Sequence, residues 1–431
     1  MSTLFKDFSK YTALSVFGMM AISVYILADT FFVAQGLGTN GLAALNLGIP
    51  VYNFIHGVGL LLGMGGATKF SIYMSKQEEH KGRQMFTLTI YLGIMFSLLF
   101  IATGLGLSET LARLSGADAS VFDMTNTYMK VLLLFSPAFI FNDILLCFVR
   151  NEGNPRLAMI ATVSGSMANI ILDYVFIFPC NMGIFGAVFA TGISPVIGIL
   201  MMVPYCLKPQ RRFKWIKTKL DGSMIKDNIL IGFPSFLAQI SSGIVMIVFN
   251  SIILGLSGNV GVAAYGVVAN ISLVVVSIYT GIAQGVQPLI SSAHGKEDKH
   301  QIHRLLHYAN ITMLVISCII YGLIVMFDQS IVHVFNSENS LELQRIASMG
   351  LKIYFTANIF LGYNTILSTY FTSVERVKPA HVLSLLRGIV LIVPMAYLLS
   401  SLFNMTGVWL ALPVTELIVA VLGFYLYKRG Q

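Results

Sequence analysis

Two acidic residues lie inside otherwise apolar stretches, and they are the first candidates for chemistry. Asp173 follows Asn169-Ile170-Ile171-Leu172 and precedes Tyr174-Val175-Phe176, and Asp29 lies in the first apolar run of the chain. If the run around Asp173 is a helix in lipid, Asn169 and Asp173 are four residues apart and share one face. A carboxylate near the centre of a membrane helix costs roughly 2.5–3.5 kcal/mol on insertion scales, so a functional role is the default interpretation.

A third predicted helix places the hydroxyl of Thr191 at the same depth in the membrane as the two carboxylates. Asp29 lies about six residues before the outer end of the first predicted span, Asp173 about five before that of the fifth, and Thr191 about seven into the sixth, a shared depth of roughly 8–10 Å. Asp29, Asn169, Asp173 and Thr191 would together suit Na⁺ as oxygen ligands, the only metal that this pattern suggests. The same cluster suits a proton, because burial and like charge oppose ionisation of both carboxylates. The sequence leaves both ions open.

Other polar side chains within the predicted spans are candidates for a substrate cavity. Two of them are acids, and for each acid a structural ion pair or a hydrogen bond to the backbone is the alternative interpretation. The spans of the second half contain amides and hydroxyls but only one acid, so we expect ion coupling to reside in the first half. Methionine and aromatic side chains of the spans suit bulky apolar cations, or else pack against lipid and core. The cavity candidates are Asp143, Asn142, Gln284, Gln287, Asn364 and Glu416.

The composition predicts that these residues are held by membrane-spanning helices. The chain has 431 residues, of which 56% are hydrophobic and 11% charged, whereas soluble domains carry about 25% charged residues. A span needs about 20 apolar residues, and twelve runs qualify, which predicts an all-α integral membrane protein. The predicted spans are 11–34, 43–68, 86–107, 128–150, 157–178, 184–207, 227–254, 262–291, 305–326, 348–371, 381–400 and 407–427.

The connectors between the predicted spans alternate between basic and nearly neutral. Lys76, Lys81 and Arg83 lie in one basic connector, whereas Gly36–Gly41 and Gly255–Gly261 contain no Lys or Arg. Because Lys and Arg favour the cytoplasmic side of a membrane, this alternation places both termini in the cytoplasm. The net charge of +8 then reflects contact with anionic lipid headgroups, and we expect no nucleic-acid partner.

Internal similarity divides the chain into two halves. Sliding the sequence by 220 residues places Gly41-Leu42-Ala43-Ala44 on Gly261-Val262-Ala263-Ala264. We therefore predict an N-lobe of six spans over residues 1–207, a cytoplasmic linker over 208–225, and a C-lobe of six spans over 226–431. Two parallel repeats of this kind are typical of transporters that rock around a central site.

Competing functions leave no recognisable pattern. Gly63-Met64-Gly65-Gly66 is not followed by Lys-Ser/Thr, so it indicates close helix packing and not a phosphate loop. His294, His300, His303 and His307 fit a solvated helix start better than a zinc site. We find no catalytic constellation and no filter loop, so we expect neither an enzyme nor a channel. No cofactor is expected apart from H⁺ or Na⁺ as the coupling ion, no cleaved signal peptide is indicated, and a monomer is expected.

Over its full length the chain resembles the multidrug and toxic compound extrusion (MATE) transporters, within them the bacterial MepA-like branch. The motifs that carry the resemblance are Ala28-Asp29-Thr30-Phe31-Phe32-Val33, Asn169-Ile170-Ile171-Leu172-Asp173, Gly183-Ile184-Phe185-Gly186-Ala187, Gly285-Val286-Gln287-Pro288 and Gly407-Val408-Trp409-Leu410-Ala411-Leu412-Pro413.

The resemblance implies a two-lobed antiporter that exports cationic, lipophilic compounds against an inward flow of H⁺ or Na⁺. It also implies an N-lobe cation site that maps onto Asp29, Asn169, Asp173 and Thr191, the four residues that the depth comparison selects. The chain departs from the family in two places, since Leu14 and Tyr174 occupy positions where proline is common.

From these observations we expect a multidrug exporter of the bacterial cytoplasmic membrane that works by alternating access. Two alternatives stay open. One is an exporter of a single metabolite, and the other is a flippase of lipid-linked cargo. A flippase should present a basic cavity to phosphate, yet the predicted spans hold almost no Lys or Arg away from their ends.

Overall fold

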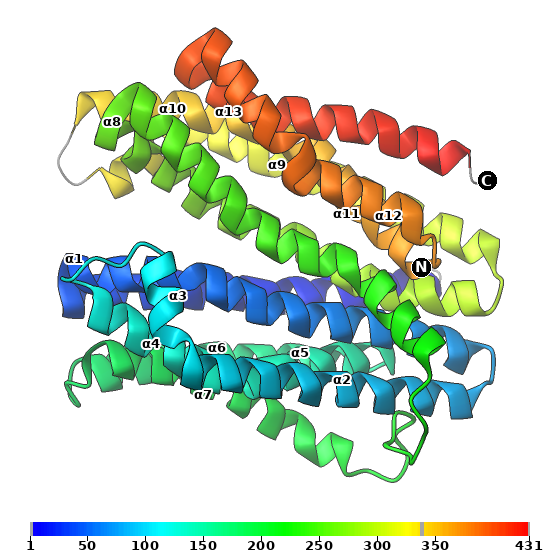
Figure 1. Cartoon of the computed structure of the whole chain (residues 1–431). Coiled ribbons are helices and arrows are strands. Elements are labelled where there is room, and N and C mark those ends of the chain that lie inside the picture. The colour runs from blue at the N-terminus through cyan, green and yellow to red at the C-terminus, as the bar shows by residue number, and fades with distance from the viewer. Residues whose placement is uncertain (1–2, 337–339, 430–431) are drawn as a thin grey trace.

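The computed structural model describes residues 3–336 and 340–429, and these form helices joined by turns, with no strand among them. The first half contains α1 (Thr3–Ser75), α2 (Glu79–Gly106), α3 (Ser108–Leu114), α4 (Phe122–Leu134), α5 (Ser136–Asn151), α6 (Pro155–Ile177) and α7 (Gly183–Cys206). The second half contains α8 (Gly222–Gly295), α9 (Lys299–Phe335), α10 (Leu341–Tyr354), the 3₁₀ turn η1 (Phe355–Ala357), α11 (Asn358–Ser373), α12 (Val377–Leu385), the π turn η2 (Leu386–Val390) and α13 (Ile392–Lys428). Figure 1 shows the helices running side by side along one long axis.

Three of these helices double back on themselves, so α1 and α8 each hold two spans, and α13 holds one span and the end of another. The backbone leaves the helical region at Gly38 in α1 (φ 65°), at Gly258 in α8 (φ 58°) and at Asn404 in α13 (φ 51°). Positive φ is easy for glycine and tolerated by asparagine, which explains these residue types at the breaks. All three breaks fall in predicted connectors that contain no Lys or Arg.

The twelve predicted spans agree with this architecture in the described part of the chain. In the first half α1 supplies two spans, α2, α6 and α7 one each, and α4 and α5, bent by 47° against each other, one more. In the second half α8 supplies two, α9 one and α10 with α11 one, while α12, η2 and α13 supply two. The structure adds α3, a short helix that hydropathy did not predict.

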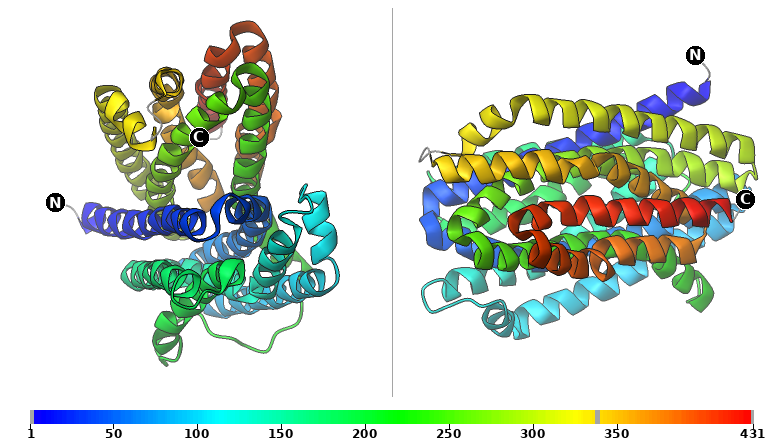
Figure 2. Two further views of the ribbon diagram at one scale, coloured as in Figure 1. Left: turned by 90° about the vertical axis from the view of Figure 1, so that its left-hand side faces the viewer. Right: turned by 90° about the horizontal axis from the view of Figure 1, so that it is seen from above.

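Each half has its own hydrophobic core. One core gathers residues from α1 to α7 and includes Phe213 from the irregular stretch after α7. The other gathers residues from α8 to α13 together with Phe8 of α1, so the start of the chain packs against the second half. Figure 2 shows the two groups of helices on either side of the molecule. We call them the N-lobe and the C-lobe, and their predicted bounds stay a prediction.

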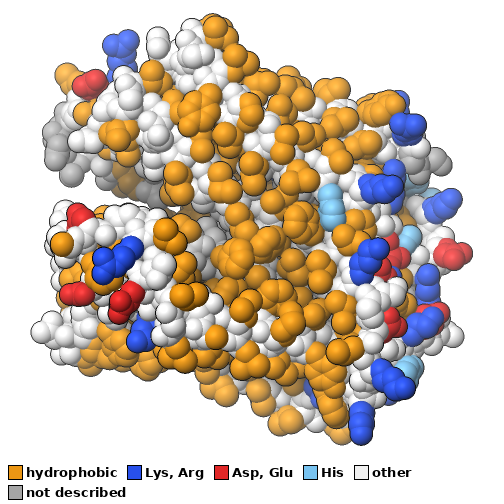
Figure 3. Space-filling view, in the orientation of Figure 1, with side chains coloured by type: hydrophobic (Ala, Val, Ile, Leu, Met, Phe, Trp, Pro, Cys, Tyr) orange, Lys and Arg blue, Asp and Glu red, His pale blue; other side chains and the backbone are white. Residues whose placement is uncertain are grey.

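The two lobes meet at one end of the molecule and part at the other. The end that carries both termini also gathers exposed Lys and Arg side chains, and we call it the basic end (Figures 1 and 3). Near it α1 and α8 pack with backbone against backbone, because Gly65 faces the Asn228 carbonyl and Gly232 faces the Leu61 carbonyl with no room for a Cβ atom. At the opposite end the surface is hollowed between the lobes (Figure 3).

Candidate functional site

The four residues of the predicted ion site are buried inside the N-lobe. Asp29 lies on α1, Asn169 and Asp173 lie one turn apart on α6, and Thr191 lies on α7. None of the four has more than 7% of its surface exposed. The Asp29 and Asp173 carboxyl groups lie close enough to interact directly. The structure therefore brings together carboxylates that are distant in the sequence.

Close helix packing holds this group in place. Gly165 of α6 lies against the backbone of Ser194 of α7, and the Ser194 hydroxyl donates a hydrogen bond of 2.9 Å to the Gly165 carbonyl. The Thr191 hydroxyl donates to the Ala187 carbonyl one turn earlier, at 3.1 Å. Since that bond uses the hydroxyl proton, the Thr191 oxygen keeps its lone pairs for a ligand.

The group is short of hydrogen-bond donors. Within the described residues, Asp29 Oδ1, both Asp173 oxygens and both Asn169 side-chain atoms lack a hydrogen-bond partner. Buried polar atoms are normally satisfied, and two adjacent buried carboxylates are costly unless a proton or cation neutralises them. The available oxygens fit H⁺ or Na⁺, whereas Asn169 Nδ2 is a donor that could turn away from the ion. Among the described residues no three His, Cys, Asp or Glu side chains are placed to hold a metal ion, so Na⁺ would also need Asn169 and Thr191.

A row of polar side chains continues from Asp29 toward the middle of the N-lobe. Tyr25, one turn before Asp29, shares a hydrogen bond with the hydroxyl of Tyr52 from the second span of α1. The Tyr52 ring lies 4.5 Å from the His56 ring, centroid to centroid. The His56 Nδ1 atom lies 2.8 Å from the Asp143 carboxylate of α5. Asp143 is thus a paired acid, and its partner is a histidine.

His56 is the residue that the sequence analysis missed. Its only signal in the sequence is a single histidine in an apolar run, four residues after a tyrosine. A histidine in an apolar run is a weaker signal than an acid, because a neutral imidazole costs little to bury. Only the packing of α1 against α5 shows that His56 has a carboxylate partner.

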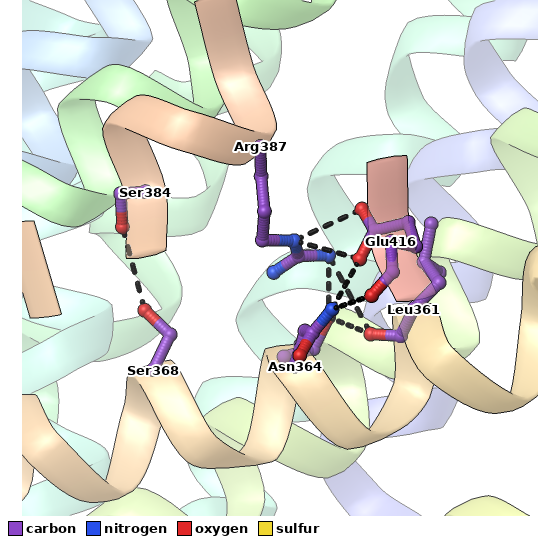
Figure 4. A network of polar contacts seen from close by, with 7 residues as sticks. Leu361, Asn364, Ser368, Ser384, Arg387 and Glu416 are labelled. Atoms are coloured by element: carbon purple, nitrogen blue, oxygen red, sulfur yellow. Dashed lines mark hydrogen bonds and ion pairs between the residues drawn. The ribbon is translucent and has the colours of Figure 1, made fainter. Parts of the chain in front are cut away.

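The acid of the second half is paired with an arginine. The Arg387 Nε atom lies 3.0 Å from both carboxylate oxygens of Glu416, and the Asn364 side chain donates to Glu416 Oε2 at 2.7 Å (Figure 4). Arg387 lies in the π turn η2, and π turns occur mostly as single insertions at special sites. Glu416 is 3% exposed, so this is a buried ion pair inside the C-lobe. Glu416 therefore has an arginine partner, as the alternative interpretation of a structural ion pair requires.

The remaining cavity candidates lie in contacts between helices. The Arg150 guanidinium of the N-lobe donates to Gln284 of the C-lobe at 2.8 Å. Gln287, fully buried, donates to the Thr68 hydroxyl of the N-lobe at 2.8 Å. Asn142 packs against Gly198 of α7, and its Oδ1 atom has no partner in the described residues. Gln284 and Gln287 thus join the lobes near the basic end.

Comparison with known proteins identifies the family to which the chain belongs. The profile of the MatE family matches residues 15–175 and 234–398, once in each half of the chain, and the chain belongs to this family. Its curated relatives include the multidrug export protein MepA of Staphylococcus saprophyticus, 26% identical over 97% of this chain and 92% of the relative. MepA of Staphylococcus aureus strain MRSA252 is also 26% identical, over the same shares of the two chains.

Solved structures agree on the fold. A multidrug resistance MATE family transporter of the MOP superfamily in an outward-facing conformation superposes with a TM-score of 0.93 at 23% identity, covering 99% of this chain and 96% of that one. A MOP superfamily transporter of Pyrococcus furiosus, described as having a binding pocket of reversed polarity, gives a TM-score of 0.92 at 24% identity over the same shares.

Proposed function

We propose that this protein is a secondary active antiporter that exports cationic, lipophilic compounds in exchange for H⁺ or Na⁺. The observation that carries the proposal is the Asp29–Asp173 pair, which is buried, lacks donors and lies within membrane-spanning helices. Such a pair has affinity for a small cation and has no evident structural purpose. The relatives named as multidrug export proteins support the choice of substrate class.

The orientation follows from the charges. Both termini and the exposed Lys and Arg side chains gather at the basic end, which the positive-inside rule assigns to the cytoplasm (Figure 3). The hollow between the lobes then opens to the outside of the bacterial cytoplasmic membrane. In this state the basic end is closed by contacts such as Gly65 against Asn228 and Gly232 against Leu61.

The cycle is a linkage between two ligands. A cation that enters from the outside neutralises Asp29 and Asp173 and favours release of the exported compound. Binding of that compound from the cytoplasm favours the ion-free pair. For the exchange to be productive, the two ligands must prefer different conformations or compete for one.

The proposal is tested by ethidium efflux from vesicles on which ΔpH and ΔNa⁺ are imposed separately. Asp173→Asn should lower gradient-driven efflux to the level of empty vesicles, because the neutral amide neither takes up a proton nor attracts Na⁺ as a carboxylate does. Asp328→Asn is the matched control, since Asp328 is also a buried acid but is paired with Lys352 at 3.0 Å. That variant should keep efflux.

Two results would contradict the proposal. One is the absence of efflux under either gradient, and the other is full efflux by Asp173→Asn. A transporter of a single metabolite would fail with ethidium and respond to that metabolite. The flippase alternative needs a free basic group, whereas Arg387 inside the C-lobe is paired with Glu416.

A further inference from the structure

The pair formed by His56 and Asp143 lies where the two lobes converge. Gly57, the residue after His56, faces the Phe236 ring of α8, and a Cβ atom there would lie 3.0 Å from that ring. From Gly57 onward α1 stays against α8 as far as Ser75, whose hydroxyl lies 3.0 Å from that of Ser292. The pair is therefore beside the closed contact between the lobes.

The packing around the pair makes room for a carboxylate and keeps it reachable. Gly59 faces Asp143, and a Cβ atom on it would lie 2.6 Å from Asp143 Oδ2. About 20% of the His56 side-chain surface and 8% of the Asp143 side-chain surface are accessible. His56 Nε2 is buried and has no partner in the described residues. The carboxylate is therefore held by one imidazole nitrogen.

Two aromatic rings lie beside His56. The His56 ring lies 4.5 Å from the Tyr52 ring and 5.1 Å from the Phe139 ring, centroid to centroid, and these two rings lie 5.8 Å apart. Ring faces attract organic cations, and a carboxylate beside them adds charge. A carboxylate beside aromatic faces is chemistry that suits a bulky organic monocation.

The charge of the pair depends on one proton. With a neutral imidazole that donates its Nδ1 proton to Asp143, the pair carries one negative charge. With an imidazolium the pair is neutral and no longer attracts a cation. Histidine changes its charge between pH 5 and pH 8, the range in which a bacterial antiporter works.

Other ionisable groups act on the pair from the helices packed around it. Arg150, two turns after Asp143 on α5, is a cation, but its Nη1 atom is engaged with Gln284 of the other lobe. The groups on α1, α4, α5 and α6 that interact with the pair or with its tyrosine neighbours are Tyr25, Asp29, Tyr52, Tyr128, Cys147, Arg150 and Asp173.

We propose that Asp143 binds the charged group of an organic monocation, and that a proton on His56 competes with this cation. The proposal deepens the proposed export function and names a substrate site that is separate from the Asp29–Asp173 ion site. A proton that reaches His56 from the outside would then displace the cation from Asp143 and favour its release.

The first test is binding of tetraphenylphosphonium to the purified full-length protein between pH 5.5 and pH 8. This cation keeps its charge at every pH, so any pH dependence belongs to the protein. Wild type should bind roughly tenfold more weakly at pH 5.5 than at pH 8. Triphenylphosphine oxide, a neutral compound of similar shape, should show no such dependence.

Two variants separate the roles of the pair. His56→Gln keeps a donor for Asp143 but cannot become charged, so at pH 5.5 it should bind tetraphenylphosphonium about tenfold more tightly than wild type. A gain of binding is not produced by misfolding. Asp143→Asn should bind at least about tenfold more weakly than wild type at pH 8. If His56→Gln follows the wild-type pH dependence, the proposal is overturned.

A second measurement uses the unmodified protein. Histidine labelled with ¹⁵N gives one set of resonances per imidazole, and that of His56 is the set missing from His56→Gln. Saturating tetraphenylphosphonium should move the His56 titration to lower pH, because the bound cation opposes the proton. An unmoved titration refutes the competition. The two proposals can fail separately. If efflux is coupled to an ion but tetraphenylphosphonium leaves the His56 titration unchanged, only the proposal about His56 and Asp143 is refuted.

Discussion

Three buried carboxylates in this protein differ in their neighbours, and the neighbours decide what each can do. Asp173 has Asp29 beside it and no donor from the described residues. Asp143 has a titratable histidine, and Glu416 has an arginine, which keeps its charge at every physiological pH. The first is suited to an exchangeable ion, the second to a proton-controlled charge, and the third to structure.

The structural role of Glu416 predicts the effect of breaking its pair. Glu416→Gln leaves the partly buried Arg387 guanidinium without its counter-charge, a change that costs up to about 3–5 kcal/mol in a fully buried pair and less here. Thermal unfolding followed by intrinsic fluorescence in detergent should therefore show a clearly lower midpoint than wild type. The double variant Arg387→Met with Glu416→Gln should recover most of the loss. A single variant as stable as wild type would show that the pair contributes nothing.

Among the secondary-structure elements, α1 and α8 carry the contact between the lobes. Each folds back at a glycine with positive φ and then returns toward the basic end. The returning half of α1 meets the first half of α8 with small residues at the closest points, so the two backbones can touch. A closed basic end depends on those points being glycine.

A methyl group at the closest point should hold the basic end apart. A Cβ atom on Gly232 would overlap the Leu61 carbonyl, so Gly232→Ala should lose gradient-driven ethidium efflux while still folding. Gly266→Ala is the matched control on the same helix, because no atom lies within 4 Å of the position of its Cβ atom. Equal efflux by the two variants would mean that the backbone contact is not needed for transport.

For the molecule as a whole, an ion-pair cluster ties the lobes together at the basic end. Lys69 of the N-lobe lies 2.6 Å from Glu375 and 2.9 Å from Asp227 of the C-lobe, and His294 lies 3.6 Å from Glu375. The nearby His294 imidazole and the Lys69 ammonium lower the pKa of Glu375 to about 2. Because this pKa is lowered, the contribution of Glu375 is complete above its usual pKa and is lost only toward pH 2.

This cluster predicts how the conformational equilibrium responds to charge. Lys69→Gln should shift part of the population toward a state that is open at the basic end. Spin labels at positions 76 and 296, in a cysteine-free background, should report a longer distance by electron–electron double resonance. Labels at 39 and 259, at the opposite end, should report a shorter one. In wild type the 76–296 distance should not lengthen from pH 8 to pH 5, because Glu375 stays ionised and a proton gained by His294 would only add attraction. A longer distance at pH 5 would contradict the role of Glu375.

Local sequence determined most of the architecture of this protein. Lipid accepts only helices with internally satisfied backbones, so the apolar runs had to be spans, and the breaks at Gly38, Gly258 and Asn404 fall in predicted connectors. The depth of Asp29, Asp173 and Thr191 followed from counting residues along helices that start at a known surface.

Tertiary structure decided the partners of the buried charges. His56 and Asp143 are 87 residues apart in the sequence, and Arg387 and Glu416 are 29 apart. Each pair meets only because its helices pack together. Hydropathy indicates which segments lie in lipid. It does not predict which side chains of two different helices come into contact. The π turn that carries Arg387 and the bend between α4 and α5 are likewise invisible to it, because they arise from packing. The positions of the spans therefore follow from the requirements of the lipid environment. The chemistry of the site follows from how the spans pack against one another.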